Sequence, residues 1–177
     1  MIYVVSGMAR TGTSMMMHAL IKGGIPAVYD IGKGDPRMLY LKEKGYDSNH
    51  DGLFELMDFN LYKRFPNDLD GEAVKIQDRQ WDKLDGEAED GLFVIYMTRD
   101  KKSNMQSLMA FTGSNNCKVF EKRYDKQKEI YSAVSKRSDA REVIVLRYED
   151  VVYAPRKVFD YLKAKGLPVN VEKAISV

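Results

Sequence analysis

The sequence predicts an α/β protein, a three-layer sandwich built on a mainly parallel sheet of four or five strands. Short apolar runs at residues 2–5, 73–76, 92–97 and 143–146 are separated by segments with helical periodicity. Continuous apolar runs are typical of strands that helices cover on both faces. Strands that alternate with helices are typical of right-handed βαβ units. With 177 residues, the chain is expected to form one domain.

Helices are predicted between these strands. Residues 13–22 are good helix formers, and the glycine pair at 23–24 marks a C-terminal stop. Residues 25–28 are a candidate fifth strand. Further helices are expected at 101–111, 118–136 and 155–165, the last with a proline in its first turn and a glycine at its end.

A long irregular insertion at residues 30–58 is rich in Gly, Asp, Asn and Lys. It contains one weak helical pattern, at 36–44. Open α/β sheets bind ligands outside the carboxyl ends of their strands, where a long insertion can cover the site. The segment is therefore interpreted as a lid or acceptor site, with a plain connecting loop as the alternative.

The composition argues against several classes of function. A formal net charge of +2 gives no general basis for binding nucleic acid or an anionic membrane. No apolar run approaches the roughly 20 residues that a membrane-spanning helix needs. The single cysteine allows no internal disulfide framework, and no secretory leader pattern is visible. We therefore expect a cytoplasmic protein, and its oligomeric state stays open.

The most informative motif lies between the first strand and the first helix. Gly7 and Gly12 have the spacing of a P-loop, in which backbone amides and the positive end of the helix dipole bind an anion. A P-loop for ATP or GTP continues with Lys and then Ser or Thr, whereas this chain has Thr13 and Ser14. The cation of the loop is Arg10, which suits a forked contact with phosphate oxygens.

The loop resembles the 5′-phosphosulfate loop of sulfotransferases that use 3′-phosphoadenosine 5′-phosphosulfate (PAPS). The residues that follow, Met15 to Met17, Ile21 and Gly23 to Pro26, resemble the compact bacterial-type members of this family. The match is full from Arg10 to Ser14, and Ala9 replaces the usual proline. The resemblance implies PAPS as cofactor, adenosine 3′,5′-bisphosphate as product, no metal requirement, and Arg10 as a stabiliser of the leaving phosphate. The residues it assigns to the 5′-phosphosulfate are Gly7, Ala9, Arg10, Thr11, Gly12, Thr13 and Ser14.

Two further motifs extend the resemblance along the chain. Arg99 follows a strand and Ser107 lies eight residues later on the predicted helix, like the Arg and Ser that bind the 3′-phosphate of PAPS in this family. A guanidinium fork with a hydroxyl two helical turns away suits a phosphate. Tyr148, in a run similar to the family's Tyr-Glu-Asp segment, is either an adenine-side contact or a core tyrosine. Glu149 and Asp150 are expected to organise the loop and helix start.

The base that takes the acceptor's proton is less clear from the sequence. Larger cytosolic sulfotransferases use a His after the strand at 73–77, where this chain has Asp78 instead. By resemblance to bacterial relatives, Glu55 is the first candidate, and His50 has a suitable intrinsic pKa. Asp78 is the third candidate. Lys75 either adds positive charge near the sulfuryl group or is an ordinary edge-strand lysine.

The function expected from these motifs is transfer of a sulfuryl group from PAPS to a hydroxyl or amine. The acceptor is a small molecule, a glycan or a peptide. Two alternatives remain open: a P-loop nucleotide or metabolite kinase, which the missing lysine at position 13 disfavours, and a non-catalytic adenine-nucleotide binder.

Overall fold

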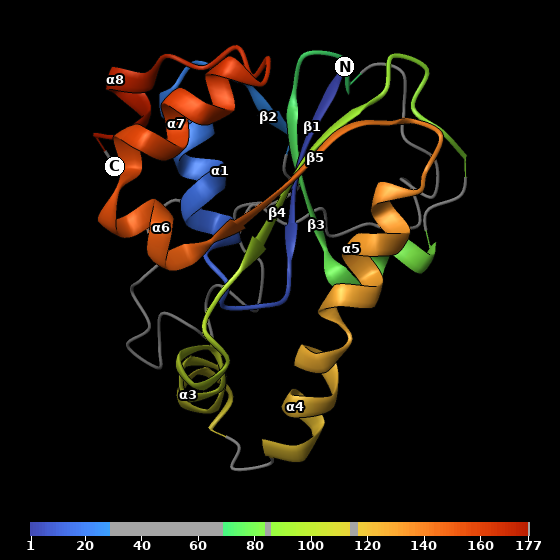
Figure 1. Ribbon diagram of the computed structural model, residues 1–177, viewed down its shortest axis with the longest axis vertical. Coiled ribbons are helices and arrows are strands. Elements are labelled where there is room, and N and C mark those ends of the chain that lie inside the picture. The colour runs from blue at the N-terminus through green and yellow to red at the C-terminus, as the bar shows by residue number, and fades with distance from the viewer. Residues whose placement is uncertain (29–68, 84–85, 114–116, 177) are drawn as a thin grey trace, which may run out of the picture.

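The computed structural model describes residues 1–28, 69–83, 86–113 and 117–176. In this part of the chain a five-stranded sheet has the order β2-β3-β1-β4-β5, and every paired strand is parallel to its neighbours. The strands are β1 (Ile2–Gly7), β2 (Ala27–Val28), β3 (Ala73–Gln77), β4 (Leu92–Thr98) and β5 (Ala140–Arg147). Helices lie on both sides of the sheet, as Figure 1 shows. The predicted α/β sandwich is confirmed.

The parallel register brings the carboxyl ends of the strands to one edge of the sheet. Gly7 pairs with Gln77 on one side and with Met97 on the other. Thr98, at the end of β4, pairs with Arg147 at the end of β5. The segments that follow β1, β3, β4 and β5 therefore begin close together, although they are far apart in the sequence.

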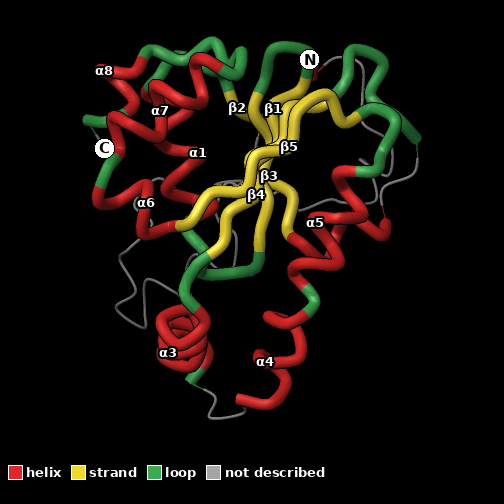
Figure 2. The backbone as a smooth tube through the Cα atoms, in the orientation of Figure 1, coloured by secondary structure: helices red, strands yellow, loops and turns green. Residues whose placement is uncertain are grey.

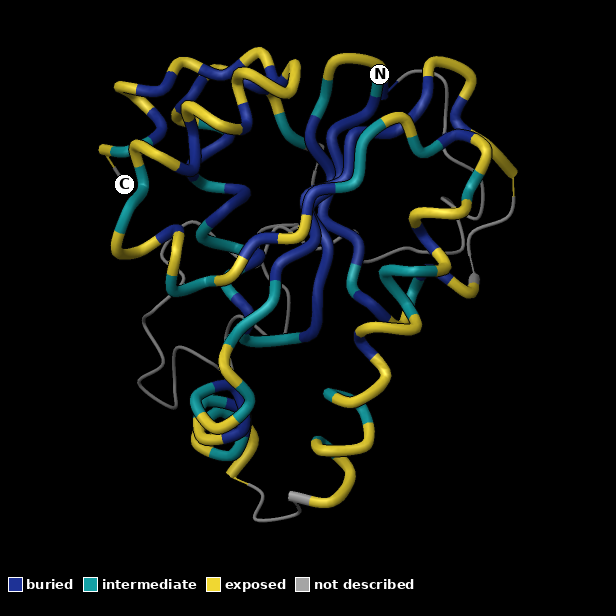
Figure 3. The backbone as a smooth tube through the Cα atoms, in the orientation of Figure 1, coloured by how far each residue is buried: buried dark blue, intermediate teal, exposed yellow. Residues whose placement is uncertain are grey.

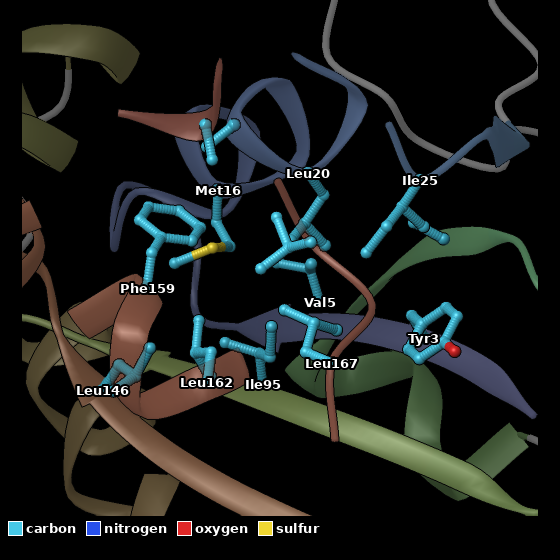
Figure 4. Close-up of a cluster of buried hydrophobic side chains, with 14 of the residues drawn as sticks. Tyr3, Val5, Met16, Leu20, Ile25, Ile95, Leu146, Phe159, Leu162 and Leu167 are labelled. Carbon is cyan, nitrogen blue, oxygen red and sulfur yellow. The ribbon is translucent and has the colours of Figure 1, made fainter. Parts of the chain in front are cut away.

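One face of the sheet is covered by α1 (Thr13–Lys22), α6 (Tyr148–Tyr153), α7 (Pro155–Ala164) and α8 (Val171–Ala174). Tyr3, Val5 and Ile95 point from the sheet into this layer, where Met16 and Leu162 pack against them (Figure 4). All five side chains are buried. Burial of each large apolar side chain stabilises the fold by roughly 1.5–3 kcal/mol before entropic costs.

The opposite face is covered by η2 (Asp78–Lys83), a 3-10 helix, and by α5 (Gln127–Ser135). Ile2 and Val4 alternate with the β1 side chains of the first face and pack here with Trp81 and Val134. Because both faces are covered, the sheet is buried through its centre, as Figure 3 shows. This explains why β1 is apolar at successive positions rather than at alternate ones.

Two helices, α3 (Lys101–Thr112) and α4 (Cys117–Asp125), extend beyond the carboxyl ends of the strands (Figure 2). The prediction of one long helix at 118–136 is wrong, because the chain forms α4 and then α5 with a break at Lys126. At the break, the Gln127 side-chain amide donates to the Tyr124 carbonyl oxygen (3.4 Å), a local bond that competes with helix continuation.

Short helices account for most other differences from the sequence prediction. The helix α6 follows β5 at once, η2 follows β3, and α8 ends the fold, whereas the sequence predicted no helix at these places. The strand β5 is longer than its apolar run and alternates buried and exposed residues near its carboxyl end, because it is an edge strand. The predicted insertion at 30–58 lies outside the described residues.

Candidate functional site

The loop between β1 and α1 depends on two glycines. Gly7 has a φ of 144°, and a Cβ atom there would lie 2.4 Å from the Met97 carbonyl oxygen. Gly12 has a φ of 90° and is the N-cap of α1. A Cβ atom on Gly12 would lie 2.5 Å from Cδ2 of Tyr148. Only glycine fits these positions, so the backbone can approach a ligand closely.

A buried lysine lies beside the start of α1. The Lys75 ammonium on β3 donates to the Ser14 hydroxyl at 3.0 Å, and Lys75 is only 4% exposed. Because β3 lies between β2 and β1, Lys75 is not an edge-strand residue. Its charge adds to the positive potential of the helix N-terminus, which also includes the buried Thr13. The loop therefore has a lysine nearby, but it comes from strand β3, whereas the lysine of a nucleoside triphosphate P-loop belongs to the loop itself.

The structure brings the two predicted phosphate-binding elements together. The Arg10 guanidinium donates through Nε to the Ser107 hydroxyl at 3.0 Å, across 97 residues of sequence. The Arg99 Nη1 group donates to the Arg10 carbonyl oxygen at 3.1 Å. The Arg10 guanidinium also lies 5.0 Å from the centre of the Phe111 ring. Two arginines and a serine from β1–α1 and β4–α3 thus form one cationic cluster.

Tyr148 contacts both parts of this cluster. Its ring packs over Gly12 and lies 4.4 Å from the Arg99 guanidinium carbon. The Arg99 Nε atom is buried and has no hydrogen-bond partner among the described residues. The ring therefore supports the guanidinium from one side by a cation–π contact, while part of the hydrogen-bonding capacity of Arg99 is unused.

The backbone around Arg99 is fixed by side chains from three helices. The Tyr124 hydroxyl donates to the Arg99 carbonyl oxygen at 2.7 Å. The next residue, Asp100, caps α3, and its amide donates to Glu149 Oε1 at 3.1 Å. Hydrogen bonds from the Ser103 backbone and hydroxyl lower the pKa of Asp100, which keeps this cap ionised. Glu149 thus organises the helix start, as the sequence predicted.

The three base candidates have different outcomes. Glu55 and His50 lie outside the described residues. Asp78 lies at the end of β3, is 1% exposed, and forms an ion pair with Arg123 of α4. Because the Arg123 guanidinium occupies this buried carboxylate, the geometry of Asp78 suits a structural role.

Asn104 contacts the loop in a way that the sequence analysis missed. It is fully buried on α3, and its Nδ2 group donates to the Ala9 carbonyl oxygen at 3.1 Å. A signal was present in the sequence, since Asn104 lies three residues before Ser107 and hence on the same helix face. Thr11 completes the loop, where its hydroxyl donates to the Met8 carbonyl oxygen at 2.7 Å.

Neither a metal site nor a membrane span is found in the described parts of the chain. Among these residues, no group of three or more His, Cys, Asp or Glu side chains is arranged to hold a metal ion. No helix in the described ranges is both long and apolar enough to cross a bilayer.

Comparison with known proteins gives structural matches alone. No protein-family model matches the sequence, and no curated protein matches it. Solved structures do match: retinol dehydratase in complex with androsterone and the inactive cofactor PAP has a TM-score of 0.52 and 14% sequence identity. The structure of retinol dehydratase with retinol and PAP has a TM-score of 0.51 and the same identity.

The two matches cover 98% of this chain and 62% of the retinol dehydratase chain. The chain therefore spans about three-fifths of the length of the proteins it resembles. At this identity the likeness shows the fold alone, an α/β fold with a parallel sheet, which is the fold class that the sequence predicted.

Proposed function

We propose that the protein is a sulfotransferase that moves a sulfuryl group from PAPS to an acceptor. One observation carries the proposal: the loop arginine Arg10 is hydrogen-bonded to Ser107, and Arg99 is hydrogen-bonded to the Arg10 backbone. Two elements that the sequence predicts to bind anions, 89 or more residues apart, are therefore neighbours in the fold. Such a pair suits a nucleotide that carries phosphate on both the 5′ and the 3′ side of its ribose.

The residues present fit this nucleotide. The 5′-phosphosulfate would lie against the loop from Gly7 to Ser14, where the N-terminus of α1 favours an anion. Both glycines lack the Cβ atom, which would clash with neighbouring protein atoms there. The 3′-phosphate would lie between Arg99 and Ser107. The Arg99 Nε atom, buried without a partner among the described residues, has the capacity for one more hydrogen bond.

PAPS, when bound, supplies the sulfuryl group: the acceptor oxygen bonds to sulfur as the bond from sulfur to the 5′-phosphate oxygen breaks. Arg10 and Lys75 then stabilise the charge that develops on the departing 5′-phosphate. The α1 N-terminus adds backbone amides to the same charge. We assign removal of the acceptor proton to Glu55, which the sequence resemblance favours over His50.

The acceptor is proposed to be a small molecule with a hydroxyl group. The two matching structures contain androsterone and retinol, which are both alcohols. A glycan, a peptide or an amine acceptor is the broader class that the sequence motifs allow.

Isothermal titration calorimetry separates this proposal from a kinase. We expect adenosine 3′,5′-bisphosphate to bind in the presence of EDTA, and ATP with Mg²⁺ to bind at least tenfold more weakly. Tight binding of ATP with Mg²⁺ and none of the bisphosphate would instead identify a kinase-like site. Adenosine 5′-monophosphate serves as the matched ligand that lacks only the 3′-phosphate.

A transfer assay with ³⁵S-labelled PAPS and a panel of alcohols and amines tests catalysis. Once an acceptor is found, Glu55→Gln should leave bisphosphate affinity unchanged and lower turnover by a factor of roughly 100 or more. Glu89→Gln, at an exposed position, is the matched control. Bisphosphate binding with no transfer to any acceptor would favour the non-catalytic nucleotide binder.

A further inference from the structure

The loop contains a β-turn of unusual conformation for its residues. Met8, Ala9, Arg10 and Thr11 form the turn, closed by a hydrogen bond from the Thr11 amide to the Met8 carbonyl oxygen at 3.3 Å. Arg10 occupies the third position with a φ of 69°, while Ala9 in the second position has no positive φ. This combination is that of a type II turn, in which glycine or asparagine is normally found at the third position.

Arg10 is strained by this conformation. Among the described residues, it is the single non-glycine residue with a positive φ. The left-handed region costs an ordinary L-residue roughly 1–2 kcal/mol. In a type I turn the same residue would have a negative φ, and the two turns differ by a flip of the central peptide, here between Ala9 and Arg10. Something in the surroundings must therefore hold that peptide in its type II orientation.

Asn104 is placed to do so. Its Nδ2 group donates to the Ala9 carbonyl oxygen, which belongs to the central peptide of the turn. Asn104 is 0% exposed, and its Oδ1 atom is buried without a hydrogen-bond partner among the described residues. An unsatisfied buried oxygen costs about 1–3 kcal/mol. Burial of the Asn104 side-chain amide therefore costs free energy. Its hydrogen bond to the loop is made by the Nδ2 group.

We propose that Asn104 is a positioning residue that selects the type II turn and so sets the direction of Arg10. A flip of the central peptide would turn the Ala9 carbonyl oxygen away from Asn104 and reverse the Arg10 amide, since the two point in opposite directions across a trans peptide. Ser107 lies one helical turn after Asn104 on α3. One face of α3 therefore holds both the backbone of the turn, through Asn104, and the guanidinium of Arg10, through Ser107.

This arrangement predicts a link between Asn104 and nucleotide affinity, and that part of the inference rests on the proposed function. Without the Asn104 donor, the turn relaxes to type I because Arg10 loses its strain. Binding of a bisphosphate then has to restore the type II turn. The strain at Arg10, about 1.4 kcal/mol, converts to about a tenfold loss of affinity.

The first test is Asn104→Leu, which keeps the size of the side chain and removes the donor. Crystal structures of the ligand-free variant should show the Ala9 carbonyl oxygen rotated and Arg10 with a negative φ. Gln106→Leu removes an amide from an exposed position of the same helix and should leave the turn unchanged. A positive φ at Arg10 in the Asn104→Leu variant would overturn the proposal. If leucine prevents folding, Asn104→Ala removes the donor without added bulk and is judged by the same outcomes.

The second test asks whether the effect of Asn104 depends on backbone strain at position 10. Arg10→Gly and Arg10→Ala both remove the guanidinium, but glycine accepts a positive φ without cost. Calorimetry should show that Asn104→Leu lowers affinity for adenosine 3′,5′-bisphosphate about tenfold in the Arg10→Ala background. In the Arg10→Gly background the same change should cost less than twofold. Equal losses in both backgrounds would show that Asn104 only fills space, and would reject its role in the turn.

The two proposals fail separately. If the wild-type protein binds no bisphosphate, the proposed function is wrong, and the crystal structure of Asn104→Leu still decides whether Asn104 selects the turn. If the wild-type protein binds the bisphosphate and Asn104→Leu binds it equally well, the positioning role is wrong and the proposed function stands.

Discussion

At the scale of single residues, the ring of Tyr148 contacts both parts of the candidate site. It packs over Gly12 of the loop and lies 4.4 Å from the Arg99 guanidinium carbon. The sequence allowed either an adenine-side contact or a core tyrosine. In the structure this aromatic side chain supports a cation that is itself hydrogen-bonded to the loop backbone, and the adenine-side contact stays a prediction.

Substitution of Tyr148 tests whether the ring or the hydroxyl matters. Tyr148→Leu should weaken binding of adenosine 3′,5′-bisphosphate about tenfold in calorimetry, since a partly buried cation–π contact contributes about 1–2 kcal/mol. Tyr148→Phe keeps the ring and should stay within about threefold of the wild type. A loss in the Phe variant as large as in the Leu variant would point to a hydroxyl contact instead. Tyr153→Leu, 85% exposed on α6, is the control.

The proposed role of Arg99 can be tested by comparing two nucleotides that differ only in the 3′-phosphate. Arg99→Ala should reduce affinity for adenosine 3′,5′-bisphosphate by a factor of about 10–100, because charge-assisted hydrogen bonds contribute about 1.5–3 kcal/mol. Its affinity for adenosine 5′-monophosphate should change little. Equal losses for the two nucleotides would exclude a 3′-phosphate role. Arg141→Ala, exposed near the amino end of β5, controls for the lost charge.

At the scale of elements, side chains of α4 bind the segments that follow β3 and β4. Arg123 pairs with the buried Asp78 at the end of β3, and Tyr124 donates to the Arg99 carbonyl oxygen. The adjacent Tyr96 hydroxyl is buried without a hydrogen-bond partner among the described residues, and burial raises its pKa. These polar contacts therefore help to hold the helix at the carboxyl edge of the sheet.

The two aspartates that anchor α4 should differ in their effect on stability. Asp78→Asn leaves the Arg123 guanidinium without its buried partner and should lower the free energy of unfolding by about 3 kcal/mol. Asp125→Asn breaks an exposed ion pair with Lys101 and should cost less than about 1 kcal/mol. Urea denaturation monitored by circular dichroism measures both. Similar small losses for the two variants would contradict the structural role of Asp78.

A second polar anchor joins the start of β5 to the segment before β4. The Arg137 guanidinium donates two hydrogen bonds to the buried Asp139 carboxylate, each 2.9 Å long, and the Ala88 amide donates a third. Burial alone would raise the pKa of Asp139, but the hydrogen bonds from Arg137 and Ala88 outweigh it and leave this pKa below its usual value.

The lowered pKa of Asp139 predicts that the free energy of unfolding decreases as the pH falls. A carboxyl group with a lower pKa in the folded state stabilises the fold at pH values above its unfolded pKa, about 3.9, and this stabilisation is lost as the pH falls below that value. The free energy of unfolding should therefore decrease from about pH 5 to pH 2. In Asp139→Asn it should be about 2 kcal/mol lower at pH 7 and depend less on pH. An unchanged acid slope in the variant would contradict this account.

At the scale of the whole molecule, the parallel sheet gathers residues from distant parts of the chain. Because β1 lies between β3 and β4, the loop after β1 meets Lys75 on one side and the segment after β4 on the other. Any ligand at this edge contacts several elements at once. Binding should therefore stabilise the entire fold rather than one helix.

Thermal unfolding measures that stabilisation. At a concentration about 100 times its dissociation constant, adenosine 3′,5′-bisphosphate should add about 2.7 kcal/mol to the unfolding free energy. For a chain of this size the melting temperature should rise by roughly 5–10 °C. Addition of EDTA should not reduce the shift. A shift that appears with ATP and Mg²⁺ but not with the bisphosphate would contradict the proposed function.

Much of the fold follows from local patterns. The helix Thr13–Lys22 was predicted to the residue, because good helix formers end at a pair of glycines. The break at Lys126 was missed, because no proline or glycine marks it and a side-chain bond from Gln127 contributes to it. The full length of β5 and its exposed residues were not predicted. A strand lies at the edge of a sheet because of the strand order, which the residues of that strand do not reveal.

For the candidate site, too, some features follow from the sequence and others from the tertiary structure. The sequence by itself determined the α/β class and the glycine spacing of the loop, and it predicted Arg99 and Ser107 as a phosphate-binding pair, since each depends on residue types at short separations. Only the tertiary structure decided three hydrogen bonds: from Arg10 to Ser107, from Lys75 to Ser14, and from Asn104 to the Ala9 carbonyl oxygen of the loop. The physical reason is that these contacts join segments 61 to 97 residues apart, and strand order alone sets which distant segments meet.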